Sequence, residues 1–172
     1  MFPSNFKDGF YPNGGLALDT TGALYGTTYS GGSGNCIGGC GVIFALRRSA
    51  AAVWNETVLH AFTGGTDGKY ADAGVAVNSK GLLFGTTTNG GDLTCNNGGG
   101  CGVVFALHPG GAQWQETVLH TFEDDATDGG MPMGAVILNR SGNVFGTTED
   151  GGRGRNIGKG TVFELDHFRD SS

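Results

Sequence analysis

Two histidines at equivalent places in the chain are the first candidates for acid–base chemistry. His60 lies in Leu-His-Ala-Phe and His120 in Leu-His-Thr-Phe. Imidazole changes charge near neutral pH and serves as a general base or a metal ligand, so two such side chains facing a central channel could be catalytic. The alternative is a structural element whose imidazole bonds to neighbouring backbone. Because the position repeats, the structural interpretation is favoured.

Carboxylates gather in the last third of the chain, most of them at positions where the other repeats carry none. Asp124 and Asp125 come shortly before Asp128, and Asp150 follows in a later segment. Calcium takes about six to eight oxygen ligands, so these four acids are a candidate calcium site, although EF-hand spacing is absent. A solvated acidic loop is the alternative, and it is favoured.

An aspartate followed by glycine recurs as Asp8, Asp67 and Asp128. Aspartate in this setting caps turns, because its side chain accepts hydrogen bonds from nearby backbone N–H groups. We therefore expect these three residues to be structural first, and ligands only if other oxygens converge on them.

The four cysteines occupy two equivalent glycine-rich loops. Cys36 and Cys40 lie in the first loop, and Cys95 and Cys101 lie in the second. Four cysteines allow three connectivities, and repeat symmetry favours the two local pairs, 36–40 and 95–101. Such disulfides would indicate an oxidising compartment. A zinc site shared between the loops and four reduced thiols are the alternatives.

A longer repeat organises all of these residues. Leu-Tyr-Gly-Thr-Thr at 24–28 returns as Leu-Phe-Gly-Thr-Thr at 83–87 and as Val-Phe-Gly-Thr-Thr at 144–148, with steps of 59 and 61 residues. A self-similar period of this length indicates an array of one supersecondary unit. We divide the single domain, 1–172, into repeats at 2–62, 63–122 and 123–165, followed by a tail at 166–172.

Bulk composition narrows the class of protein. The 172 residues include 35 glycines, 38% are apolar, and the formal charge is −6 with a pI near 5.0. A nucleic-acid partner is excluded for want of a basic stripe, and no apolar run has the length of a membrane helix. The start of the chain lacks the pattern of a secretion signal. We expect either a signal that was removed or a start inside a longer reading frame.

Each repeat contains short apolar segments separated by turn residues, which is typical of strands. Segments 49–53 and 108–112 are expected to connect hairpins. Eleven strands are predicted, at 15–18, 23–28, 42–46, 54–62, 75–78, 82–87, 103–107, 114–122, 136–139, 143–148 and 161–165.

Four antiparallel strands per repeat predict an all-β fold, a β-propeller-like array of about three blades. A β-sandwich or β-prism is the alternative. Because three blades would leave exposed faces and edges, we expect a homodimer that closes a six-bladed ring. Phe2 aligns with Phe122, so the chain is expected to begin at the tail of a further blade strand.

The motifs resemble a known repeat family. The order L-x-x-D-x-x-G-x-L-Y-G-T-T, a glycine-rich loop, C-G-V-[IV]-F-x-L, E-T-V-L-H-x-F and D-G-x-x-P is similar to the GloVer tandem repeats, from Phe2 to Leu165. The resemblance implies a secreted or surface-anchored bacterial protein with propeller-like arrays, and no common activity. The third copy departs from it, with Asn156 and Lys159 where cysteines are expected, and Ala71 replaces a proline in the second.

Two functions follow as hypotheses. The first is an extracellular or periplasmic module that binds a ligand, glycan or protein on its loop face. The second is a calcium-assisted lactonase or esterase, in which Asp124, Asp128 and Asp150 hold the ion and His60 or His120 acts as base. Nucleophile and phosphate-loop motifs are absent. Trp54 and Trp114, at equivalent strand starts, are expected to pack between blades.

Overall fold

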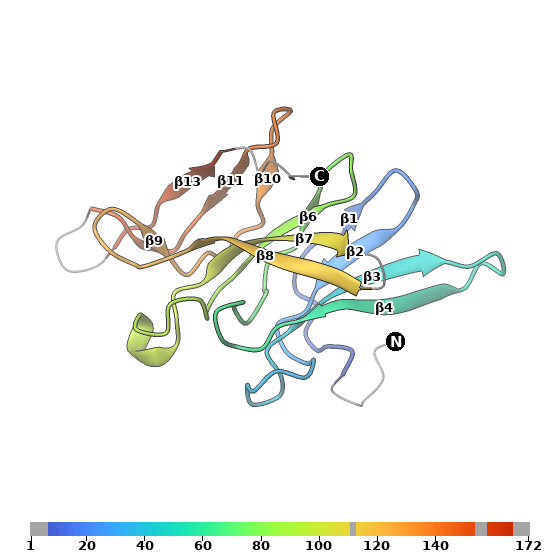
Figure 1. Cartoon of the computed structure of the whole chain (residues 1–172), viewed down its shortest axis with the longest axis horizontal. Helices are drawn as coiled ribbons and strands as arrows, with labels where there is room; N and C mark the ends of the chain where they lie inside the picture. Colours follow the sequence, from blue (N-terminus) through green and yellow to red (C-terminus); the bar gives the residue numbers. More distant parts are fainter. Residues whose placement is uncertain (1–6, 111–112, 154–157, 167–172) are drawn as a thin grey trace.

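The computed structural model describes residues 7–110, 113–153 and 158–166, and these form an all-β chain (Figure 1). Thirteen strands are present in this part, together with one short 3-10 turn, Asn96–Gly98. Phe2, Asn156 and His167 lie outside the described residues. No helix among the described residues is long and apolar enough to cross a membrane.

The first two repeats each form a four-stranded antiparallel sheet in sequence order. The first sheet contains β1 (Ala17–Leu18), β2 (Leu24–Thr27), β3 (Val42–Arg48) and β4 (Trp54–Ala61). The second contains β5 (Ala76–Val77), β6 (Leu83–Thr87), β7 (Val103–Gly110) and β8 (Gln113–Thr121). The predicted connection at 49–53 falls between β3 and β4. The one predicted at 108–112 is wrong for residues 108–110, which continue β7 and pair with β8, and its last two residues lie outside the described part of the chain.

The third repeat forms a three-stranded sheet of β10 (Ile137–Leu138), β11 (Val144–Thr147) and β13 (Val162–Leu165). All eleven predicted segments therefore contain a strand. The prediction missed a two-stranded ribbon of β9 (Gly129–Gly130) and β12 (Asp150–Gly151). The earlier repeats have the same pairing as single bridges, Phe10 to Ser30 and Lys69 to Asn89. None of the four sheets is closed on itself.

The glycine of each repeated motif lies beneath an aromatic ring of the third strand of its sheet. Gly85 pairs with Phe105, and a Cβ added to Gly85 would come within 2.6 Å of the phenyl Cζ. Gly26 and Phe44 show the same arrangement, also with 2.6 Å. The motif therefore requires glycine because the ring occupies the space of any side chain.

The two threonines of the motif have separate tasks. Thr28 Oγ1 accepts from Val42 N at 3.1 Å and donates to Ser30 O at 2.8 Å, which ties both ends of the glycine-rich loop together. Thr27 Oγ1 instead donates to Ala73 O, in the next repeat, at 2.7 Å. The second and third repeats reuse the loop bond, and the second reuses the inter-repeat bond.

Successive sheets pack face to face and form two apolar clusters. In the cluster between the first two sheets, Phe62 contacts Phe105 at a centroid distance of 5.4 Å. In the cluster between the second and third, Phe122 contacts Phe163 at 5.3 Å. These four rings fill the same position at both junctions, so the junction is itself a repeated unit.

Both predicted disulfides are present. Cys36 pairs with Cys40 and Cys95 pairs with Cys101, with Cα–Cα distances of 5.1 and 5.7 Å. Each disulfide loop also contacts the next repeat through backbone. The carbonyl of Cys40 accepts from Tyr70 N, and that of Cys101 accepts from Met131 N, both at 2.8 Å. The local pairing expected from repeat symmetry is therefore confirmed.

Gly85→Ala should destabilise the protein by about 1–3 kcal/mol, because the new methyl group would meet the ring of Phe105 in a closed core. Urea unfolding followed by tryptophan fluorescence measures the difference. Gly15→Ala is the matched control, since nothing lies within 4 Å of its added Cβ. Equal midpoints for the two variants would contradict this role of the motif glycine.

Candidate functional site

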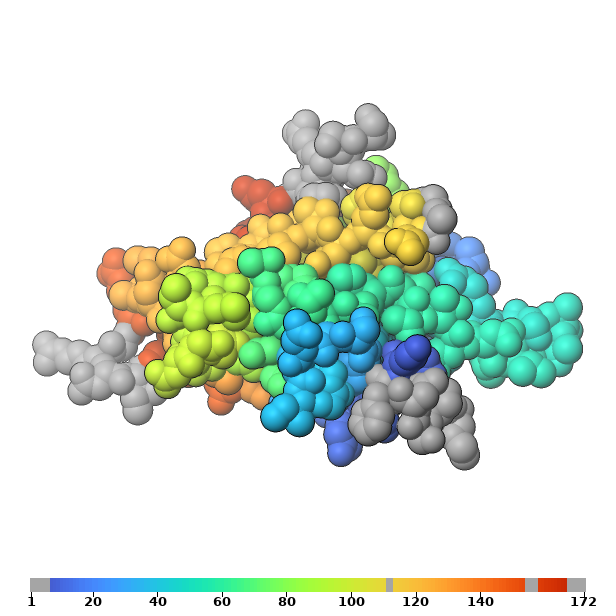
Figure 2. All heavy atoms as spheres, turned by 60° about the horizontal axis from the view of Figure 1, so that its bottom comes forward, coloured from blue at the N-terminus to red at the C-terminus, as the bar shows by residue number. Residues whose placement is uncertain are grey.

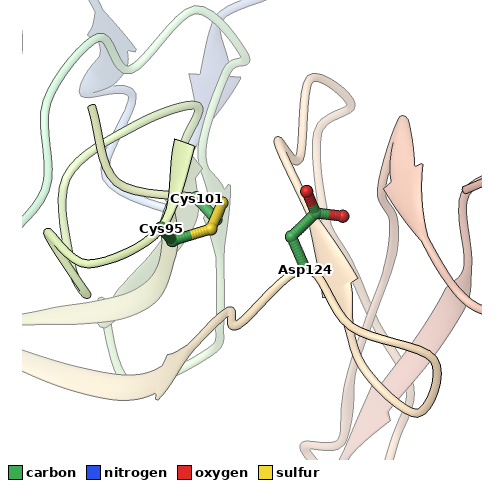
Figure 3. Close-up of side chains that lie close together, drawn as sticks. All are labelled: Cys95, Cys101 and Asp124. Carbon is green, nitrogen blue, oxygen red and sulfur yellow. A yellow bond between two sulfur atoms is a disulfide. The ribbon is translucent and has the colours of Figure 1, made fainter. Parts of the chain in front are cut away.

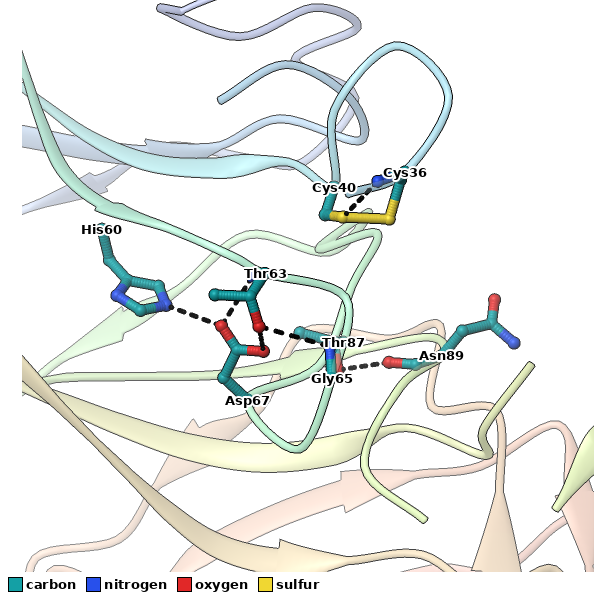
Figure 4. Close-up of a disulfide and its surroundings, with 8 residues drawn as sticks. All are labelled: Cys36, Cys40, His60, Thr63, Gly65, Asp67, Thr87 and Asn89. Carbon is teal, nitrogen blue, oxygen red and sulfur yellow. Dashed lines mark hydrogen bonds and ion pairs between the residues drawn. A yellow bond between two sulfur atoms is a disulfide. The ribbon is translucent and has the colours of Figure 1, made fainter. Parts of the chain in front are cut away.

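The junction between the first two repeats brings together one histidine and two carboxylates. Nε2 of His60 lies 3.7 Å from Oδ2 of Asp67 and 3.8 Å from Oε2 of Glu116. His60 comes from the end of β4, Asp67 from the following loop and Glu116 from β8 (Figure 4 shows His60 and Asp67). We call these three residues the junction cluster.

A β-bulge turns His60 toward the second repeat. The register shifts in β3–β4 so that Ile43 pairs with His60 while Phe44 pairs with Val58. Without the extra residue, strict alternation would place His60 on the same face as Val58, away from the next sheet. The same shift recurs between β7 and β8, where Val104 pairs with His120. The bulge therefore aims both histidines across their junctions.

Asp67 is held by its own loop. Its Oδ2 accepts from Thr63 N at 2.7 Å, and its Oδ1 accepts from the Thr63 hydroxyl at 2.5 Å. Burial opposes ionisation, but the neighbouring His60 and the hydrogen bonds from Thr63 outweigh it and hold the pKa of Asp67 below its usual range. The carboxylate of Asp67 is therefore held in place and ionised beside His60.

Glu116 is the unusual member of the cluster. Its side chain is 10% exposed, and its Oε1 has no hydrogen-bond partner. Burial raises the pKa of Glu116 to about 7, an effect that His60 reduces and Asp67 increases. A carboxyl group placed beside apolar strand residues and a second carboxylate is an expensive arrangement, which points to a specific role.

Each end of the array carries half of a junction cluster. At the third repeat, His120 Nε2 lies 3.0 and 3.1 Å from the two oxygens of Asp128, and no described residue takes the place of Glu116. At the first repeat, Glu56 is the equivalent of Glu116, and its Oε1 has no hydrogen-bond partner. Burial raises the pKa of Glu56, and so does Asp8, which is the equivalent of Asp67 in the first repeat. The two halves are complementary in residue type.

A family model matches residues 1–163, which includes the first two repeats, the junction cluster and all but the last two residues of the third repeat. Its description is the Gloeobacter/Verrucomicrobia repeat. The chain belongs to this family. No curated protein matches the sequence. The resemblance deduced from the motifs is therefore confirmed over nearly the whole chain.

The four acids predicted to bind calcium have separate roles in this Gloeobacter/Verrucomicrobia repeat protein. Asp128 also accepts from the backbone of Glu123 and Gly129, and Asp125 accepts from Thr127 N and Asp128 N, so these two carboxylates cap turns. Burial raises the pKa of Asp124, and the charge of the neighbouring Asp150 raises it further. Calcium binding by the four stays a prediction.

Among the residues that the structure describes, two groups of three potential ligands have their donor atoms within 4.8 Å of one another. One is the junction cluster. The other is Cys95, Cys101 and Asp124 (Figure 3), whose sulfurs are joined in a disulfide and cannot act as thiolate ligands. The junction cluster is therefore the stronger candidate site.

Glu116→Gln should stabilise the protein at pH 8 and have little effect near pH 4.5. Because the pKa of Glu116 is raised to about 7, its contribution to stability is complete below about pH 4.5 and is lost as pH rises through 7. The amide carries no charge to desolvate, so the gain at pH 8 is on the order of 2 kcal/mol. Urea unfolding in EDTA at both pH values measures it.

Glu123→Gln is the control, because it removes an exposed carboxylate outside the junction cluster. It should show no comparable gain at pH 8. A Glu116→Gln protein less stable than the parent at pH 8 would contradict the cost assigned to the buried charge.

Proposed function

We propose that the chain is an extracytoplasmic, propeller-like repeat module that binds a ligand on its loop face. The loop face consists of residues 29–41, 63–73 and 88–102. The observation that supports it most is a division of roles between side chains. The repeated polar side chains hold the array together, while exposed Ile37 lies between two paired cysteines and exposed Tyr29 and Leu93 lie on the adjoining loop segments. Two disulfides also favour an oxidising compartment.

The loops of this face lie beside one another in space. Figure 2 shows the light-blue first disulfide loop and the yellow-green second one on the same side, with green segments between them. Ile37, between Cys36 and Cys40, is fully exposed, and Leu93 is 46% exposed. Exposed apolar side chains on rigid loops are typical of a binding surface, because little order is lost on association.

Aromatic rings add a second element to the loop face. Tyr29 and Tyr70 stack with centroids 4.5 Å apart and planes 8° from parallel. Asn13 donates a hydrogen bond to Asp72 at 2.9 Å. Burial raises the pKa of Tyr29, and the neighbouring Tyr70 and Asp72 raise it further. Aromatic rings beside amide and carboxylate groups suit the faces and hydroxyls of sugars, so a glycan is the ligand class to test first.

A calcium-dependent hydrolase is the weaker candidate. That function needs several carboxylates around one ion and a histidine free to take a proton. In the described residues, Asp125 and Asp128 are occupied by turn N–H groups, and His120 contacts Asp128 through both carboxylate oxygens. The same residue positions serve the repeat junctions, which favours binding over catalysis.

Closure into a ring by a second copy of the chain is part of this proposal. The face of the second sheet that the first one covers buries Val75 to 7% exposure, and Val77 packs against the same cluster. Their equivalents on the first sheet, Leu16 and Leu18, are 55% and 64% exposed. A hollow of about 600 Å³ lies on the same open face, beside Glu56.

The open face of the third sheet is the one that, in the first two sheets, packs against the next repeat. Val162 is 81% exposed where Ile43 and Val104, its equivalents, are fully buried. The open faces of the two end sheets are therefore the two sides of an ordinary junction, and head-to-tail pairing of two copies would cover both.

Light scattering coupled to size exclusion tests the closure. We expect a dimer mass for the parent, and a monomer for Leu18→Glu, because a carboxylate would be buried at the shared face. Val53→Glu, at an exposed apolar position in the β3–β4 turn, is the control and should stay dimeric. A monomeric parent at high micromolar concentration would contradict the proposal.

An array of immobilised bacterial and plant glycans tests the binding function. Tyr29→Ala should reduce any saturable signal at least about tenfold, because the stacked platform is lost. Val53→Ala is the control, since this apolar residue is 57% exposed in the β3–β4 turn, away from the loop face. Absence of any glycan signal, or a signal indifferent to Tyr29→Ala, would contradict a glycan-binding loop face.

A further inference from the structure

We propose that the junction cluster, His60, Asp67 and Glu116, binds a divalent transition-metal cation of the zinc class between the first two repeats. This site is separate from the loop-face platform and from the four acids predicted for calcium. It does not depend on the proposed binding function.

The spacing of the donor atoms supports this inference. The imidazole Nε2 lies 3.7 and 3.8 Å from the two carboxylates, and all three donors fall within 4.8 Å of one another. Those separations exceed a hydrogen bond, which spans about 2.7–3.2 Å. Zinc binds nitrogen and oxygen donors at about 2.0–2.2 Å, so two ligands of one ion lie roughly 3–4 Å apart. The cluster has the spacing of shared ligands.

The unsatisfied atoms of the cluster are a second, independent observation. His60 Nε2 and Glu116 Oε1 are buried and lack hydrogen-bond partners. Buried polar atoms in native proteins are nearly always satisfied, and a bound ion is a recognised explanation for an exception. A cation between the donors would satisfy the imidazole and compensate the charge of both carboxylates.

The second repeat provides an internal comparison. With no third ligand present, His120 closes on Asp128 to 3.0 and 3.1 Å. His60 has the same loop aspartate available and stays farther from it, facing Glu116 as well. The presence of Glu116 therefore coincides with a longer separation between the histidine and its loop aspartate.

The surroundings of the cluster fix its ligands in place. Thr63 binds both oxygens of Asp67, as Figure 4 shows, and the ring of His60 meets the edge of Phe62 at 4.8 Å and 81°. Support of this kind orients metal ligands. One imidazole with two carboxylates favours zinc-class cations over calcium or magnesium, which prefer all-oxygen sites. Side-chain exposures of 18% and 15% for His60 and Asp67 leave a route for entry.

Calorimetric titration of EDTA-treated protein with Zn²⁺ tests the inference, and Co²⁺ is the spectroscopic probe. We expect saturable zinc binding, a raised Tm and visible cobalt absorption. Glu116→Gln and Asp67→Asn, both nearly isosteric, should weaken zinc binding at least about tenfold, as should His60→Ala. His108→Ala is the control, because it removes a histidine outside the cluster, and it should leave zinc affinity unchanged.

Three results would overturn the inference. The first is no zinc binding by the parent protein, which would leave the cluster as a contact between the first two repeats only. The second is binding that survives His60→Ala and Glu116→Gln together. The third is equal loss in His108→Ala, which would mean adventitious binding at surface histidines. Thermal unfolding of every variant in EDTA confirms that each is folded before its affinity is compared.

Discussion

The structure depends on one constraint: a four-stranded sheet with apolar residues on both faces is stable only if both faces are covered. A single repeat buries neither face alone, so each sheet must stack on the next. The rings of Phe62 and Phe105, and of Phe122 and Phe163, mark where this stacking is tightest. The glycine of each motif follows from it, because a ring can lie flat across the sheet only where its cross-strand partner has no side chain.

Polar residues then fix how the stacked sheets are aligned. Apolar contact is non-directional, whereas the bond from Thr27 to the Ala73 carbonyl and the bond from Tyr70 to the Cys40 carbonyl each have one geometry. Both are repeated at the next junction, so the array has a definite register. The histidine, aspartate and glutamate of the junction cluster lie in the same interface, where the charge of Glu116 is costly unless something compensates it.

Repetition also separates scaffold from function. A side chain that makes the same contact in two or three repeats, such as Thr28 with its loop, is explained by the fold. What differs between repeats is concentrated on the loop face, where the two disulfide loops have different lengths and different exposed residues. Family membership adds no activity to this picture, so the loop face and the junction cluster carry the functional argument.

The sequence by itself determined the all-β class, the strand segments, the repeat period and both disulfides. These features are local or periodic: alternation, turn residues and cysteine spacing act within one repeat. Tertiary structure decided the site. The bulge that turns His60 across the junction, the arrival of Glu116 beside it and the pairing of β9 with β12 each bring together segments that alternation alone places apart. A repeated glutamate among apolar strand residues was the available signal, but only stacking of one repeat on another shows what that glutamate faces.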